Sequence, residues 1–102
     1  MTEVEIIMSH VTRGDMLAQL AEECSELAQA ALKLRRTFEG TSPTPTSKET
    51  AEANLREEIA DVMLTALYSI GISEEAIKEI MDIMDAKETR WAKRLSSEKV
   101  GD

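Results

Sequence analysis

Residues 20–27 read LAEECSEL and residues 55–62 read LREEIADV. Both stretches are rich in Ala, Leu and Glu, which favour helices. In the first stretch, Leu20 and Leu27 are seven residues apart, so both lie on one face of a helix. In both stretches, acidic residues interrupt an apolar pattern that has this helical period. The period indicates an all-α fold.

The same period continues outward and predicts two long helices, at about 13–38 and about 47–70. Their apolar stripes are Met16, Leu20, Leu27, Ala31 and Leu34 in the first helix and Leu55, Ile59, Val62, Ala66 and Ile70 in the second. The segment at about 39–47 holds both prolines and several Gly, Ser and Thr residues, which is typical of an exposed, mobile loop. The loop would let the two helices pack antiparallel.

Two further helices are predicted at the ends of the chain. Thr2 and Glu5 form a capping-box pattern that opens a short helix at about 2–11. Ser73 can cap a long helix at about 74–95, after which residues 96–102 are expected to fray. This last helix is expected to turn inward Ile77, Ile80, Met81, Met84, Trp91 and Leu95.

Composition agrees with a single all-α domain spanning residues 1–102. Aromatic residues make up 3% of the chain, and there are only four glycines and two prolines. The expected architecture is a helical bundle of three long helices plus a short N-terminal helix. A chain of 102 residues is near the lower end of what can bury its own core, so we expect oligomerisation.

Charge and cysteine content restrict partners and location. The formal net charge of −8 would repel a nucleic-acid polymer, whereas a small phosphate ligand could bind if a cation reversed the local field. Cys24 is the single cysteine, the N-terminus does not resemble a secretory signal, and no apolar run reaches the roughly 18 residues of a membrane span. We therefore expect a cytoplasmic protein without a membrane partner.

Four acidic residues break the apolar stripes of the two central helices. Glu23 occupies the position where a leucine would continue the first stripe, and Glu26 lies beside it. Glu58 and Asp61 repeat the spacing on the second helix. If the helices pack antiparallel, the two pairs face each other as four convergent carboxylates.

Such a cluster would be unfavourable without a cation, because like charges repel and burial disfavours each ionised form. Its ligands would all be hard oxygens, which favours magnesium, manganese or calcium over zinc or copper. The di-iron carboxylate bundles use Glu-x-x-His pairs, and the only histidine, His10, lies outside both motifs. The pattern therefore indicates a site for a hard divalent cation.

The stretches 20–27 and 55–62 resemble the paired EExxE and ExxD signatures of the MazG-like nucleoside triphosphate pyrophosphohydrolases. The resemblance covers about residues 19–94 and implies an all-α fold in which two chains complete a four-helix bundle. It also implies a homodimer or a dimer of dimers. The implied activity is hydrolysis of nucleoside triphosphates to the monophosphate and pyrophosphate.

The resemblance also implies residue roles. Glu23, Glu26, Glu58 and Asp61 would be ligands of Mg²⁺, with Mn²⁺ as a substitute. Glu22 would orient the attacking water, and Glu22 and Glu23 are the catalytic candidates, although the acid that accepts the proton stays open.

The last predicted helix carries Lys87, Arg90 and Arg94 at spacings of three and four, which forms a basic stripe. Similar residues in the last helix of the family contact phosphates, so these three are the candidate substrate-binding residues. Lysine and arginine also favour the C-terminal turns of helices for electrostatic reasons, which is the structural alternative.

Two other functions fit the same residues. The chain could be a non-catalytic interaction module in which the acidic pairs form salt bridges to Arg35, Arg36 or Arg56. It could also bind a metal ion without turning over a nucleotide. The first alternative predicts no metal dependence of the melting temperature.

Overall fold

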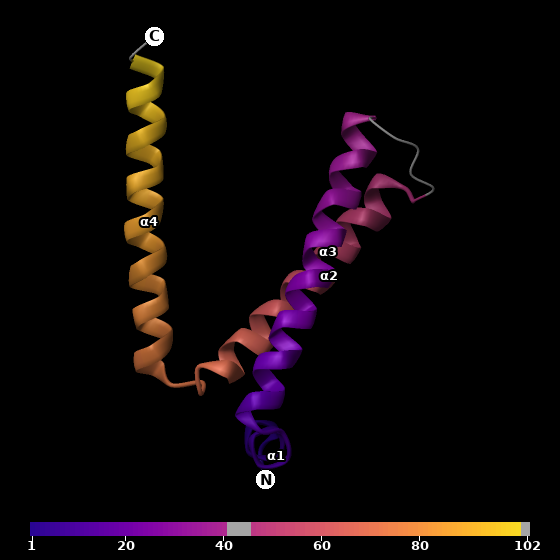
Figure 1. Cartoon of the computed structure of the whole chain (residues 1–102), viewed down its shortest axis with the longest axis vertical. Coiled ribbons are helices and arrows are strands. Elements are labelled where there is room, and N and C mark those ends of the chain that lie inside the picture. Colours follow the sequence, from indigo (N-terminus) through magenta and orange to yellow (C-terminus); the bar gives the residue numbers. More distant parts are fainter. Residues whose placement is uncertain (41–45, 101–102) are drawn as a thin grey trace. The chain divides into compact units, whose positions relative to one another are not determined.

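The computed structural model describes residues 1–40 and 46–100, and every secondary-structure element in these ranges is a helix (Figure 1). In chain order the elements are α1 (Glu3–His10), α2 (Arg13–Glu39), α3 (Lys48–Ser69) and α4 (Glu74–Val100). The all-α class and the order of one short and three long helices are confirmed. The predicted loop at about 39–47 lies largely outside the described residues, because residues 41–45 are not described.

Each helix begins at a hydroxyl side chain that accepts a hydrogen bond from a backbone N–H three residues later. The pairs are Thr2 with Glu5 at 3.1 Å, Thr12 with Asp15 at 3.1 Å, Ser47 with Thr50 at 3.2 Å and Ser73 with Ala76 at 3.0 Å. Gly71, between α3 and α4, has φ 87°, a left-handed conformation that glycine adopts without steric cost. Local sequence therefore determines where the helices begin.

The α2 and α3 helices lie side by side and run antiparallel (Figure 1). At one end of the pair, Nε of Arg13 near the start of α2 donates a hydrogen bond to the backbone oxygen of Ser69, the last residue of α3, at 3.3 Å. Among the described residues, the fully buried ones are Ala30, Ala51 and Ser69, all small. Small side chains let two helix axes approach closely, which brings the longer side chains of the two helices together.

The apolar stripes of α2 and α3 are largely as predicted, with small differences. The half-buried stripe residues are Met16, Leu20, Leu27, Leu34, Leu55, Val62 and Ala66. On α2, Ala30 is buried and the predicted Ala31 is exposed. The contact of α2 with α3 is therefore centred one residue earlier than predicted at this position. Ile59 on α3 is 39% exposed, because one partner helix covers only part of the stripe, and the predicted Ile70 lies just after the end of α3 and is 36% exposed.

The chain divides into two units, Met1–Ser69 and Ile70–Asp102, and α4 belongs to the second. Within this second unit nothing covers the predicted stripe of α4 among the described residues: Met81, Met84 and Trp91 are 62%, 63% and 59% exposed. Ile80 and Leu95 are also exposed, and Ile77 is half-buried. The stripe has helical period, and its burial against another surface stays a prediction. The helix also continues past the predicted end at Leu95 to Val100.

None of the helices in the described ranges is apolar over a length that would cross a bilayer.

Candidate metal centre

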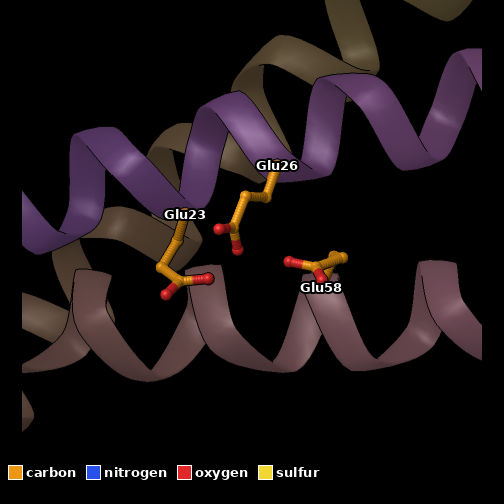
Figure 2. Close-up of side chains that lie close together, drawn as sticks. All are labelled: Glu23, Glu26 and Glu58. Atoms are coloured by element: carbon orange, nitrogen blue, oxygen red, sulfur yellow. The ribbon is translucent and has the colours of Figure 1, made fainter.

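Three acidic side chains from two helices meet between α2 and α3. Glu23 and Glu26 extend from α2 toward α3, and Glu58 extends from α3 toward α2 (Figure 2). One carboxylate oxygen from each of the three residues lies within 4.8 Å of the others. The antiparallel packing of the two helices therefore brings together residues from both predicted acidic pairs.

Two oxygens of this cluster lack a hydrogen-bond partner. Oε2 of Glu23 and Oε2 of Glu58 are buried, and no donor among the described residues reaches either of them. The other oxygen of Glu23 accepts a hydrogen bond from Nε2 of Gln19 at 2.8 Å. A buried, unpaired carboxylate oxygen is costly, and a cation bound by both oxygens would remove that cost.

Mutual repulsion among these carboxylates also changes the acidity of Glu26. The carboxylate of Glu23, followed by that of Glu58, raises the pKa of Glu26 above its ordinary value. Nearby negative charge disfavours the ionised form of a carboxyl group, and a proton or a metal ion relieves that repulsion. The electrostatics of the site therefore favour a cation at the cluster.

The donor set fits a hard divalent cation. Three carboxylates and no thiol or imidazole meet at the site, which suits magnesium or manganese and gives no support to zinc. Magnesium usually takes only one or two protein carboxylates and completes its shell with waters and substrate phosphates. A cluster that is open on one side is therefore appropriate for a nucleotide-binding metal.

The fourth predicted ligand, Asp61, is not part of this group of three. It lies on α3 three residues after Glu58, and its side chain is exposed. Residues three apart occupy the same side of a helix, so Asp61 is next to the cluster along α3. Glu22, the predicted water-orienting acid, is exposed on α2. The roles of both residues stay predictions.

Among the residues that the structure describes, the ion pairs expected for a purely structural role are not formed. In the described parts of the chain, the salt bridges join Arg35 to Glu39 and Lys78 to Asp82, each at 2.9 Å. Neither involves a residue of the acidic cluster. No lysine or arginine of the described ranges therefore neutralises the cluster.

The basic stripe predicted to bind phosphates is on α4. Lys87, Arg90 and Arg94 are exposed there, at spacings that place them along one side of the helix. Because α4 belongs to the second unit, these residues are described only along their own helix. Phosphate binding by them stays a prediction.

Gln19 is a residue of the site that sequence reasoning missed. Its amide holds Glu23 in place across one turn of α2, from four residues earlier. The signal was available, since residues four apart on a helix are neighbours and Gln–acid pairs at that spacing form hydrogen bonds. A search for acidic residues alone does not find it.

Comparison with known proteins agrees with this geometry. The family model described as the MazG nucleotide pyrophosphohydrolase domain matches residues 11–96. Searches of the curated proteins and of the solved structures found no match. The matched range contains both acidic stretches, from Glu23 to Asp61, and includes most of α4. The chain therefore belongs to the MazG nucleotide pyrophosphohydrolase domain family.

Proposed function

We propose that the protein is a Mg²⁺-dependent pyrophosphohydrolase that cleaves nucleoside triphosphates into the monophosphate and pyrophosphate. Mn²⁺ is expected to replace Mg²⁺, because both are hard cations that bind carboxylates. The observation that carries the proposal is the group formed by Glu23, Glu26 and Glu58, with two buried oxygens that lack partners. Family membership supplies the reaction class.

Glu23, Glu26, Glu58 and Asp61 are the proposed metal ligands. Glu23 and Glu58 are half-buried, with Glu23 held by Gln19, whereas Glu26 and Asp61 are exposed and would be accessible to a substrate. When bound, the metal ion would neutralise charge on the phosphate oxygens and make a nearby water more acidic. The carboxylates thus provide a fixed, negatively charged frame for positioning.

The proposed reaction is attack of water on the α-phosphorus with pyrophosphate as the leaving group. Positioning and charge neutralisation account for most of the catalysis of phosphoryl and nucleotidyl transfer, so few side chains need to react. Glu22 and Glu23 are the candidates for orienting the water and accepting its proton. Lys87, Arg90 and Arg94 are the proposed phosphate-binding residues, because guanidinium and ammonium groups pair well with phosphate oxygens.

We further propose that two chains, alone or as a dimer of dimers, complete the helical bundle. Met81, Met84 and Trp91 of the α4 stripe are exposed, and their spacing of three and seven residues places them on one side of the helix. A long helix gains most of its stability from packing of an apolar face. A second copy of the chain would supply that packing.

The proposed reaction is tested by incubating the protein with a panel of ribonucleoside and deoxyribonucleoside triphosphates and Mg²⁺ in water enriched in oxygen-18. We expect monophosphate and pyrophosphate, with the heavy oxygen in the monophosphate, because water attacks the α-phosphorus. Diphosphate with orthophosphate would overturn the proposal. If Mg²⁺ binds and no nucleotide is hydrolysed, the protein is a metal-binding helical protein without this activity.

A further inference from the structure

The two carboxylate oxygens of Glu23 have different surroundings. Oε1 accepts a hydrogen bond from Nε2 of Gln19 at 2.8 Å, whereas Oε2 is buried and no donor among the described residues reaches it. A carboxylate only accepts hydrogen bonds, so the amide nitrogen of Gln19 must face Glu23. The protein therefore holds one oxygen of Glu23 and leaves the other for a ligand.

Glu58, on the opposite helix, is held differently. Asn54 comes four residues before it on α3, which is the spacing of Gln19 and Glu23 on α2. The side chain of asparagine is one methylene shorter than that of glutamine, and Oε2 of Glu58 is buried without a partner among the described residues. Of the two half-buried acids of the cluster, Glu23 is thus the one whose carboxylate an amide fixes from the preceding turn.

The surroundings of Gln19 give its amide few other partners. Gln19 lines a pocket of about 240 Å³ whose walls are mostly apolar and include Met16, Leu64 and Tyr68. Asp15, four residues earlier on α2, is also at this wall, but the amide nitrogen donates to Glu23. The hydrogen bond between Gln19 and Glu23 is therefore the polar contact that links this wall to the acidic cluster.

A carboxylate binds a metal ion through one oxygen or through both, and the choice affects which ion fits. Calcium takes about six to eight oxygen ligands in a flexible shell and accepts a carboxylate through both oxygens, whereas magnesium requires a smaller, nearly octahedral shell. Binding of an ion through both oxygens of Glu23 would compete with the hydrogen bond from Gln19. Coordination through Oε2 alone keeps that bond and suits magnesium.

We propose that Gln19 is a positioning residue that keeps Glu23 in single-oxygen coordination and thereby makes the acidic cluster select Mg²⁺ over Ca²⁺. The inference rests on the proposed function, in which Glu23, Glu26 and Glu58 hold the metal ion. Gln19 acts through Glu23 and needs no contact of its own with the ion or the nucleotide. The amide fixes the carboxylate, and the fixed carboxylate limits the shell.

The test is a competition titration without nucleotide. Mn²⁺ is bound to the protein, and its displacement by Mg²⁺ or Ca²⁺ is followed through the electron paramagnetic resonance signal of free Mn²⁺. Gln19→Met keeps the length and helix propensity of the side chain but removes the donor. We expect the affinity for Mg²⁺ to fall about tenfold, the lower end for partners of metal ligands, because Gln19 is exposed. The affinity for Ca²⁺ should fall by less than about threefold, because Glu23 can then bind through both oxygens.

Two further variants locate the effect. Gln19→Asn keeps an amide but shortens the side chain by one methylene, so it should not reach Glu23 and should bind both ions as Gln19→Met does. Gln29 is the other glutamine of the chain, is exposed, and lies about 120° from Glu23 around α2. Gln29→Met should therefore bind both ions as the original protein does. Circular dichroism and thermal melting without metal check the fold of each variant.

Equal loss of affinity for Mg²⁺ and Ca²⁺ in Gln19→Met would overturn the selection, because a general weakening of the site acts on both ions alike. Unchanged affinity for Mg²⁺ in Gln19→Met, or an equal loss in Gln29→Met, would overturn the positioning role of Gln19. Failure of the original protein to bind Mn²⁺ would overturn the metal site and this inference with it. These titrations involve no turnover, so the product assay tests the proposed reaction separately.

Discussion

The α2–α3 pair and α4 depart from ordinary helix patterning in opposite ways. In the pair, Glu23 and Glu58 are half-buried, each with one buried carboxylate oxygen, at positions where apolar side chains would stabilise the fold. On α4, apolar side chains such as Met84 and Trp91 are exposed where polar ones would be expected. Each departure lowers the stability of the isolated chain, because one buries charge and the other exposes apolar surface.

The difference indicates what each region lacks. A cluster of carboxylates with partnerless oxygens lacks a cation, and a helix with an uncovered apolar stripe lacks a protein surface. We therefore expect removal of the metal to affect the α2–α3 pair and disruption of assembly to affect α4. Three measurements would test that separation.

The largest effect is expected from loss of a metal ligand. In Glu23→Gln and Asp61→Asn the side chain keeps its size but loses its charge, so kcat/KM should fall by at least about 100-fold, above the loss typical of residues that only orient ligands. Helical circular dichroism should persist. The measurement is steady-state release of pyrophosphate from a nucleoside triphosphate with saturating Mg²⁺.

Glu49→Gln is the matched control for these variants. Glu49 is also on α3, nine residues before Glu58, so helix geometry turns it to the opposite side of the helix, and it is exposed. Its activity should stay within about twofold of the original protein, as expected for a surface substitution. Unfolding of both cluster variants would show that these acids support the fold and not the reaction.

The next effect is expected on α4. Introducing charge with Met84→Glu should weaken self-association by at least about tenfold, since removal of an anchoring contact typically costs more than 1 kcal/mol at an interface. Sedimentation velocity over a range of protein concentrations measures this change. Binding of Mg²⁺ at the α2–α3 pair should be weakened much less.

Ala86→Glu supplies the comparison for that experiment. Ala86 lies two residues after Met84, which is about 200° around the helix, so the same charge is placed on the side opposite the stripe. Association of Ala86→Glu should match that of the original protein. Equal weakening in the two variants, or none in Met84→Glu, would contradict a role of the stripe in assembly.

The smallest effect is the pH dependence of stability without metal. The folded protein raises the pKa of Glu26, mainly through Glu23, so it binds more protons than the unfolded chain between the ordinary and the raised pKa. The stability contributed by this group is complete below the ordinary pKa and is lost as pH rises through the raised value. The thermal midpoint of the metal-free protein should therefore fall more with rising pH than that of Glu26→Gln.

Magnesium should change the direction of that dependence. A metal that needs deprotonated ligands competes with protons, so the stabilisation by Mg²⁺ should increase with pH. Thermal melting with and without millimolar Mg²⁺ at each pH gives both curves. If the thermal midpoints of the original protein and of Glu26→Gln depend on pH in the same way, the repulsion attributed to this cluster is contradicted.

Much of the fold was predictable because its signals are local. The caps at Thr2, Thr12 and Ser73 and the left-handed glycine at Gly71 act within one turn of the chain, and all are present in the structure. One prediction failed where it depended on a partner surface, since Ala31 is exposed while Ala30 is buried, and burial of the α4 stripe stays a prediction. Periodicity shows that a face is apolar but does not show what covers it.

The acidic site was predictable in part for a similar reason. Spacing on each helix identified Glu23, Glu26 and Glu58, because an acid within an apolar stripe stands out in the sequence. Spacing did not distinguish Glu58 from Asp61, and only the first of these joins the group of three in the structure. Gln19 was missed because a neutral amide in a helix has no distinctive pattern.

The sequence by itself determined the all-α class, the helix starts and the identity of the acids that interrupt the stripes, since these depend on backbone propensity and on contacts within one or two turns. Only the tertiary structure decided which carboxylates converge, which of their oxygens lose their partners, and that the pocket beside Gln19 exists. Those properties arise from the distance and rotation between α2 and α3, set by the small residues Ala30 and Ala51 at their contact.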